Sequence, residues 1–453
     1  EHVYNNGVSN QVIFRIPTAT EVGKLHNTAN LYSQNALNAN SAFFNDTWAL
    51  GKLTINAGVR WDQYKGWLPE QKSLGATVGP TVVLAESFAK TDLYTWNQIA
   101  PRIGVVFDLT GDGKTVLKGN YGLYWFNPGV GVSSDVNPNT SSKNETYGWN
   151  DINGDKRWQP GEQTTLQSAS LKGAIGLDPN LSAPYTHEAA FWLERQLTDQ
   201  VGLRAGYVYK TEDNLFSLYV PTRGPAVYAA NGVPFTFTDI GLDGVRGTAD
   251  DRVLNYVGLP TSGNFSTKQI EMNTGQYSRY KTFETSVNKR YGNKWSASLG
   301  GSMTWLGDFP NGFPQNPAQP GFENRTQWNF KASGSYDAPW GIRLSPVLRH
   351  QSGTAYARTN TLTFPTGITG TGTTIYMEPM DSNREDNVTV IDVRAEKTVN
   401  LHARLKARLF LDGFNLTNSH SSETISRATG TGYQKPSAIL APVTFRIGAR
   451  IMW

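Results

Sequence analysis

Hard oxygen ligands gather in one polar stretch of the sequence, residues 151–162. Four side chains take positions 1, 3, 5 and 12 of this stretch: Asp151, Asn153, Asp155 and Glu162. Oxygens at this spacing can surround Ca²⁺, and the carboxylate at position 12 can bind it through both oxygens. Lys156 stands at position 6, where such loops have a glycine that eases the turn. The stretch predicts a calcium-binding loop, with an ordinary Asp/Asn/Gly turn as the alternative.

A second group of carboxylates lies in a glycine-rich stretch, residues 239–251. Its four members are Asp239, Asp243, Asp250 and Asp251. Negative charges held close together repel, so either a cation or Arg246 and Arg252 must neutralise them. Calcium is the metal that such a hard oxygen set favours. A solvated loop with exchanging salt bridges is the alternative.

Catalytic motifs are absent from the sequence, which has no HExxH, no GxSxG and no phosphate-binding P-loop. There is no cysteine, so thiolate metal sites and cysteine nucleophiles are excluded. Glu188 and Glu194 share one face of an alternating segment, as do Asp392 and Glu396. They could imitate an acid/base pair, but we expect them to be charges that face a wet interior. We therefore expect no enzymatic activity and no cofactor apart from calcium in external loops.

The composition limits the elements that could hold these residues. The chain has 453 residues, of which 38% are hydrophobic and 12% aromatic, and it contains 45 glycines. A large soluble core would be hard to fill from this inventory, whereas a barrel with a wet lumen needs only an apolar outer face. No run of about 18 apolar residues occurs, which excludes transmembrane helices. The net charge of +4 is small and dispersed, so we expect no nucleic-acid partner.

Strict alternation of apolar and polar residues is the strongest pattern in the chain. Leu53, Ile55 and Ala57, for example, alternate with polar residues or glycine. Alternate side chains of a strand point to opposite faces, so each segment has an apolar and a wet face. This predicts an all-β, transmembrane, antiparallel β-barrel with about fourteen visible strands. The segments lie near 10–18, 39–50, 52–65, 97–110, 113–126, 185–198, 200–212, 278–290, 294–307, 325–338, 341–352, 388–400, 402–416 and 442–453.

The connections between these segments alternate between tight links and long polar insertions. The long ones lie near 66–96, 127–184, 213–277, 308–324, 353–387 and 417–441. Such alternation predicts short periplasmic turns and long extracellular loops on a single β-barrel domain over residues 1–453. A soluble sandwich or propeller is the alternative, but a propeller would repeat at a fixed period, which this chain does not.

The last segment has a feature of its own. Phe445, Ile447, Ala449 and Ile451 alternate up to the terminal Trp453. A final strand that ends in an aromatic residue resembles the signal read by the outer-membrane assembly machinery. Aromatic residues at other segment ends fit the interfacial girdles of a bilayer. These features predict the bacterial outer membrane as location, with its lipid, its lipopolysaccharide and the assembly machinery as partners.

Several stretches resemble the TonB-dependent transporters, and among them the Oar-like receptors. The strand LTINAGVRWD at 53–62 is similar to the family's LTLNLGLRYD. The segment from PRIG at 101–104 through GDGKT at 111–115 to Tyr121 and Gly122 resembles a family hairpin. The FNLTN element at 414–418 resembles another family motif, which precedes a long loop and the closing strand. The likeness extends over most of the chain.

This resemblance implies a barrel of 22 strands closed by an amino-terminal plug. It also implies a TonB-type energy-coupling protein, which would act through that plug. About fourteen strands are visible and no plug or TonB box precedes them. We therefore expect the carboxy-terminal portion of a longer chain, with a smaller complete barrel as the alternative.

Three functions follow as hypotheses. The leading one is transport of a substrate across the outer membrane, energised through the inner membrane. The second is a passive channel of fourteen strands, and the third is a surface-interaction or scaffold barrel whose loops bind a partner. The substrate is not encoded in any motif, since one barrel type serves many substrates.

Overall fold

The computed structural model describes thirteen ranges of the chain: residues 2–5, 8–15, 33–73, 76–78, 81–83, 86–139, 144–170, 175–263, 265, 269–308, 323–369, 373–402 and 405–453. All structural statements below concern these residues. None of the helices among them has the length and apolar character needed to cross a membrane.

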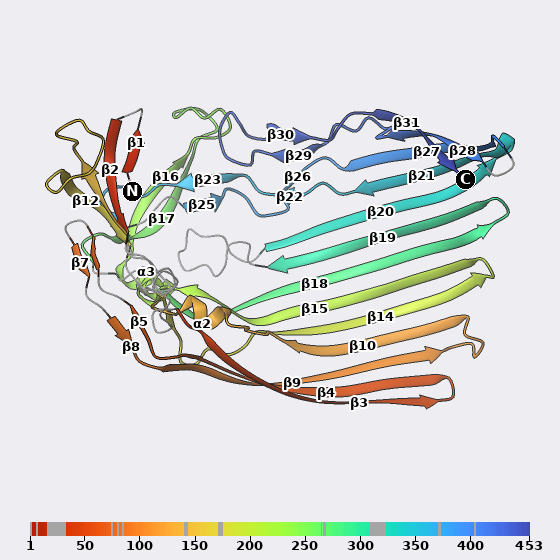
Figure 1. The fold of residues 1–453 in the computed structure, drawn as a ribbon, viewed down its shortest axis with the longest axis horizontal. Helices are drawn as coiled ribbons and strands as arrows, with labels where there is room; N and C mark the ends of the chain where they lie inside the picture. The colour runs from red at the N-terminus through yellow and green to blue at the C-terminus, as the bar shows by residue number, and fades with distance from the viewer. Residues whose placement is uncertain are drawn as a thin grey trace.

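One large antiparallel sheet dominates the molecule, and we call it the wall (Figure 1). Thirteen long strands follow one another in it in chain order, and each pairs with the next. They are β3 (Ala36–Leu50), β4 (Leu53–Leu68), β9 (Thr91–Asp108), β10 (Thr115–Trp125), β14 (Tyr185–Thr198), β15 (Val201–Tyr219), β18 (Gln269–Gly292), β19 (Trp295–Asp308), β20 (Glu323–Ala338), β21 (Ile342–Gln351), β27 (Val388–Asn400), β28 (Lys406–Phe414) and β31 (Thr444–Met452). A short strand, β13 (Ile175–Leu177), joins the same sheet by parallel pairing with β18.

The two faces of the wall differ as the alternation predicts. On β31 the apolar set is strongly exposed, with Phe445 at 63%, Ile447 at 85% and Ile451 at 57%. On the opposite face of the neighbouring strand Asp412 is 3% exposed and binds arginines. A sheet face with so many exposed apolar side chains is stable when lipid hydrocarbon covers it. We call the apolar side the outer face and the polar side the inner face.

Tight turns close one end of the wall, at the right of Figure 1. The β3–β4 hairpin turns at Gly51, whose φ of 61° favours glycine. In the β9–β10 link the carboxylate of Asp108 accepts hydrogen bonds from the backbone N–H groups of Gly111 (2.8 Å) and Gly113 (2.9 Å). These local contacts hold the register, so each strand keeps its apolar residues on the outer face.

Thirteen of the fourteen predicted segments correspond to wall strands, but the first does not. Residues 8–15 form β2 (Val8–Arg15), which lies in a separate four-stranded sheet. It pairs there with β1 (His2–Asn5) and β11 (Asn144–Trp149), and β11 pairs in turn with β12 (Gln163–Ser170). The prediction of a wall strand at 10–18 was therefore wrong for the described part, and residues 16–18 lie outside it. Alternation shows that a segment is a strand, but not which sheet it joins.

The long connections carry small elements of their own at the other end of the wall (Figure 1). The first connections contain β5 (Gln71–Ser73), β6 (Ala76–Val78), β7 (Thr81–Val83), β8 (Glu86–Phe88) and α2 (Gly131–Asp135). The later ones contain η2 (Pro221–Arg223), α3 (Pro225–Asn231), β16 (Val233–Asp239), β17 (Arg252–Pro260), β22 (Ala355–Tyr356), β23 (Thr359–Leu362), β24 (Ile368–Thr369), β25 (Thr373–Tyr376), β26 (Asn383–Arg384), β29 (Ser422–Ile425) and β30 (Pro436–Ile439). One more short helix, η3 (Pro339–Gly341), lies in the tight β20–β21 turn. Most of the predicted loop at 308–324 lies outside the described residues.

Candidate functional site

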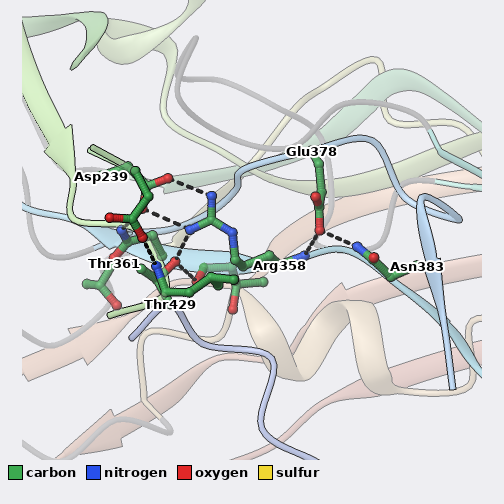
Figure 2. Close-up of polar contacts among 10 residues, drawn as sticks. Asp239, Arg358, Thr361, Glu378, Asn383 and Thr429 are labelled. Atoms are coloured by element: carbon green, nitrogen blue, oxygen red, sulfur yellow. Dashed lines mark hydrogen bonds and ion pairs between the residues drawn. The ribbon is translucent and has the colours of Figure 1, made fainter. Parts of the chain in front are cut away.

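A buried ion pair joins two of the long loops. Asp239, at the end of β16, is fully buried, and Arg358, next to β23, is 8% exposed. The guanidinium donates two hydrogen bonds to the Asp239 carboxylate, from Nη1 to Oδ1 (2.9 Å) and from Nη2 to Oδ2 (2.7 Å), as Figure 2 shows. Asn360 Nδ2 donates a third to Oδ1 (3.0 Å). The planar guanidinium therefore binds both oxygens of the carboxylate in a bidentate ion pair.

The same arginine extends the network to further residues. Its Nη1 also donates to Thr429 Oγ1 (2.7 Å), which belongs to the loop between β28 and β31. Its backbone N–H donates to Glu378 Oε1 (2.8 Å), and Asn383 Nδ2 donates to the same oxygen (Figure 2). One side chain thereby links three loops that are far apart in sequence. We call the unit formed by residues 233–260, 355–369, 373–384 and 422–439 the loop cap.

An apolar cluster lies within the loop cap. Leu362 and Ile375 are almost completely buried, at 0% and 1% exposure, and Met377 is at 8%. Partly buried aromatic and aliphatic side chains of the other strands pack on them: Phe235, Phe237, Leu254, Tyr256 and Phe364. Strand β17 also pairs with β24, through Leu259 opposite Thr369 and Pro260 opposite Ile368. The loops thus have a small core of their own, which makes the cap an ordered unit.

Electrostatics support a charged pair inside the cap. Burial alone would raise the pKa of Asp239, but the hydrogen bonds and charge of Arg358, with Asn360, outweigh burial and lower the pKa of this carboxyl. The hydrogen bonds that Arg358 donates to Asp239 in turn raise the pKa of the arginine. Removing one partner of a buried pair leaves an uncompensated charge, which costs about 3–5 kcal/mol.

The first predicted calcium loop is exposed except at its end. Asp151 accepts backbone hydrogen bonds from Gly154 (2.9 Å) and Lys156 (2.8 Å), and Asp155 accepts one from Arg157 (2.7 Å). In the same loop, Asn153 Oδ1 accepts the Asp155 N–H at 3.0 Å.

The residue at position 12, Glu162, is 5% exposed. Its Oε2 accepts hydrogen bonds from Trp149 Nε1 (3.1 Å) and from the Gln159 N–H (2.9 Å). Lys156 has a φ of 59°, so it adopts the backbone that position 6 of a calcium loop requires. Calcium binding by this loop stays a prediction.

The second predicted calcium group is divided between two places. Asp239 lies with Arg358, whereas the other three carboxylates stay in the exposed turn. There Asp243 accepts the Val245 N–H (2.7 Å), Asp250 the Leu242 N–H (2.7 Å) and Asp251 the Gly247 N–H (2.6 Å). Within the described ranges, no three Asp, Glu or His side chains come together as a metal site would require. Calcium here also stays a prediction, and Arg358 is a neutralising partner that the sequence pattern did not indicate.

Charged side chains line the inner face of the wall in neutralising groups. Asp412 binds Arg394 (2.6 Å) and Arg446 (2.6 Å) on the two adjacent strands. Asp392 binds Arg349 at 3.0 Å, and Glu396 lies 4.0 Å from Arg408. These pairs join neighbouring strands: Asp412 lies directly opposite both of its arginines, and the other two pairs are diagonal. The carboxylates at 392 and 396 are thus held by arginines on neighbouring strands.

A shallow pocket of about 320 Å³ lies on the inner face near the middle of the wall. Trp192 packs flat over Gly206, where a Cβ atom would lie 2.0 Å from the indole ring, and Arg204 stacks on the ring at 3.8 Å. The polar lining is Arg204, Glu284, Ser302, Asn329 and Lys331. Glu194 lies beside this group and binds Lys118 at 2.7 Å. The pocket offers an aromatic edge and charges of both signs to a polar solute.

Arg358, Glu378 and Thr429 are the residues that sequence reasoning missed. No local pattern marks them, and Arg358 is 119 residues from its partner Asp239. The only signal for the site was Asp239 itself, taken as part of a carboxylate group.

Comparison with known proteins identifies the family. The model of the outer membrane beta barrel domain matches residues 18–350, which is more than half of the chain. No curated protein matches the chain.

Several solved structures are similar to it. The Escherichia coli outer membrane transporter YddB is 12% identical, with a TM-score of 0.44, over 92% of this chain and 54% of that one. The ferric-catecholate import receptor Fiu of E. coli K12, in its closed form, is 14% identical (TM-score 0.45; 92% and 45%). The FrpB iron transporter from Neisseria meningitidis, F5-1 variant, is 11% identical (TM-score 0.45; 97% and 49%).

The chain spans about half the length of these structures. The family match and the two-faced wall agree on a membrane-spanning sheet. The chain belongs to the outer membrane beta barrel domain family, and it lies in the bacterial outer membrane.

Proposed function

We propose that the chain is the carboxy-terminal barrel portion of a TonB-dependent transporter, which moves a polar substrate across the outer membrane with energy from the inner membrane. The observation that carries this proposal is the loop cap, joined by the Asp239–Arg358 ion pair. Loops that merely border a passive pore need no buried ion pair among themselves. Loops that select a substrate gain from being held in one arrangement, because less conformational freedom is lost on binding.

The inner face supports the same role. Charged pairs and the pocket beside Trp192 give a substrate a succession of weak polar contacts between the cap and the turn end of the wall. Contacts that are individually weak allow a solute to enter and to leave. The family motifs at 53–62, 101–122 and 414–418 add the resemblance to TonB-dependent transporters.

The edges of the wall bear on the passive-channel alternative. In the described part of the chain, β3 pairs only with β4, and β31 pairs only with β28. A complete small barrel would pair its first and last strands, because an unpaired edge in lipid leaves backbone N–H and C=O groups unsatisfied. This favours a wall that continues in further strands; a plug domain is part of the proposal because the resemblance to TonB-dependent transporters implies one.

The test is genetic and uses the full reading frame in its own bacterium. Deletion of this gene is expected to abolish growth on a particular scarce nutrient, and deletion of the TonB-type coupling protein should abolish growth on the same nutrient. Arg358→Met in the chromosomal gene should reduce uptake while the protein still assembles. Continued uptake without the coupling protein would establish a passive channel. Intact uptake in both deletions, with loss of adhesion to a surface or partner, would establish a scaffold.

We also propose that the loop at 151–162 binds calcium from the external medium. The positive φ of Lys156 supports this, since it gives position 6 the backbone conformation that a glycine adopts in such loops. The strand at 445–453 is our proposed contact for the assembly machinery, supported by the 94% exposure of Trp453.

A further inference from the structure

A short inward-folded segment lies on the inner face near the loop end of the wall. Helix α2 packs Val132, which is 3% exposed, against Tyr94 and Trp96 of β9. Ile99, farther along the same strand, is 59% exposed and lies on the outer face. Tyr94 and Trp96 are an odd number of residues from it, so their side chains lie on the inner face. Tyr94 and Trp96 stack with their ring centres 4.4 Å apart. Helix α2 therefore covers the inner face, on the path between the loops and the lumen.

One side of this segment is anchored by amide hydrogen bonds. Asn137 Nδ2 donates to Asn35 Oδ1 at 2.9 Å and to the Gln34 carbonyl at 3.0 Å. Asn139 Nδ2 donates to Gln71 Oε1 at 3.2 Å. Both asparagines are buried, and a surrounding of low dielectric constant strengthens these hydrogen bonds.

The other side of the segment carries Asp135, which interacts electrostatically with the buried carboxylate of Glu271. Glu271 on β18 lies between Leu177 of β13 and Leu218 of β15 in the sheet, and it is 6% exposed. Its Oε2 has no hydrogen-bond partner among the described residues. The hydroxyls of Tyr94 and of Ser133 on α2 are buried close to each other. All three side chains are more than nine-tenths buried. Buried polar groups normally have a partner, and a group left unsatisfied destabilises the state that buries it.

The charged and titratable groups around Glu271 come from each element packed against it. Helix α2 contributes Asp135, of like charge, and β9 contributes Tyr94. After β13, Asp178 donates its backbone N–H to the Glu271 carbonyl, while its own carboxylate accepts the Asn180 N–H. The β15 neighbour is the apolar Leu218. Glu271 lies beyond the part of β18 that pairs with β19, and thus outside the membrane-spanning segment.

We propose that Glu271 is a proton-binding site that controls the docking of α2 on the inner face. The protonated carboxyl can donate a hydrogen bond to the oxygen atoms around it and has no charge to repel Asp135, so α2 stays docked. The ionised carboxylate is buried, its Oε2 has no hydrogen-bond partner in the described part of the chain, and its charge repels Asp135, so it releases this side of the segment. This proposal does not rest on the proposed transport function, because it concerns only whether α2 is docked or exposed.

The direction of the pH dependence follows from the environment. Burial, with a smaller contribution from Asp135, raises the pKa of Glu271 to about 7. A raised carboxyl pKa means that the docked state binds the proton more tightly than the released state. Docking is therefore fully stabilised below the ordinary carboxyl pKa and is lost as the pH rises through about 7.

The chain has no cysteine, which permits a direct test by thiol labelling. Val132→Cys in the full chain, reconstituted in lipid, places a thiol in the buried contact, and Val130→Cys places one at an exposed position of the same segment. We take the ratio of the labelling rate of the Val132→Cys variant to that of the Val130→Cys variant, so that the intrinsic pH dependence of thiol reactivity cancels. We expect this ratio to rise by roughly tenfold to a hundredfold between pH 5 and pH 8. In the Glu271→Gln background it should stay low at both pH values.

A ratio that does not change with pH, or a rise that persists in Glu271→Gln, would overturn the proposal. A fall of the ratio at pH 8 on addition of calcium chloride would overturn it too, because a metal ion would then be the ligand. Asp135→Asn should move the midpoint to lower pH. If the cysteine at 132 prevents assembly, hydroxyl-radical oxidation of Trp96 in the unmodified chain measures the same opening.

Discussion

At the residue scale, the Asp239–Arg358 ion pair decides whether three loops act as one unit. Both groups are buried, and each has the other as its main partner. We expect Arg358→Met or Asp239→Asn to destabilise the loop cap by about 3–5 kcal/mol, and hydrogen exchange of β23 and β25 to accelerate by roughly two to four orders of magnitude. The double variant should destabilise the loop cap by less than the sum of the two single changes, because the two residues interact directly.

Arg246→Met is the matched control, since Arg246 is exposed in a loop of the same cap. Its exchange rates should equal those of the unchanged protein. Equal acceleration in Arg246→Met and Arg358→Met would contradict a special role for the buried pair.

The calcium prediction for residues 151–162 also belongs to this scale. Titration of the full chain with calcium chloride should show one site with a dissociation constant in the range of about 10⁻⁴–10⁻³ M, as in other extracellular modules. Glu162→Gln should remove the heat of binding, because the twelfth position supplies the bidentate carboxylate. Glu423→Gln, at an exposed loop position, serves as the control. Binding that survives Glu162→Gln would exclude this loop as the calcium site.

At the element scale, neighbouring residues of one strand face lipid and lumen. On β19, Leu299 lies on the outer face between Trp295 and Trp305, and Ser298 lies on the inner face. We expect Leu299→Arg to lower the free energy of unfolding in lipid vesicles by about 2–4 kcal/mol, and Ser298→Arg to change it little. Denaturant titration followed by tryptophan fluorescence measures both. Equal losses in the two variants would show that the strand has been assigned the wrong faces.

At the scale of the whole molecule, the loop cap and the α2 segment should respond differently to pH. The pKa of Asp239 is lowered, so the ion pair stabilises the cap above the ordinary carboxyl pKa and is lost only in more acidic solution. The pKa of Glu271 is raised to about 7, so α2 loosens as the solution becomes neutral. Oxidative footprinting at pH 5 and pH 8 should therefore change at Trp96 and stay constant at Met377. A parallel change at both residues would indicate one general transition instead.

Much of the wall could be predicted from the sequence, because its determinants are local. Alternation fixes the faces of each strand, and residues such as Gly51 and Asp108 close the tight turns. Thirteen segments therefore became wall strands near their predicted positions. The contacts among the loops could not be predicted in this way, because they join residues that are far apart in the sequence. The pattern of carboxylates in 239–251 did not reveal that Asp239 would bind Arg358.

By itself, the sequence determined an outer-membrane sheet with an apolar and a polar face, since a period of two is a property of each strand alone. Only the tertiary structure decided that β2 leaves the wall for another sheet, that three loops join in one cap, and that Glu271 is buried. The physical reason is the same in each case. Burial and pairing of a polar group depend on which distant segments fold over it, and no local spacing encodes that choice.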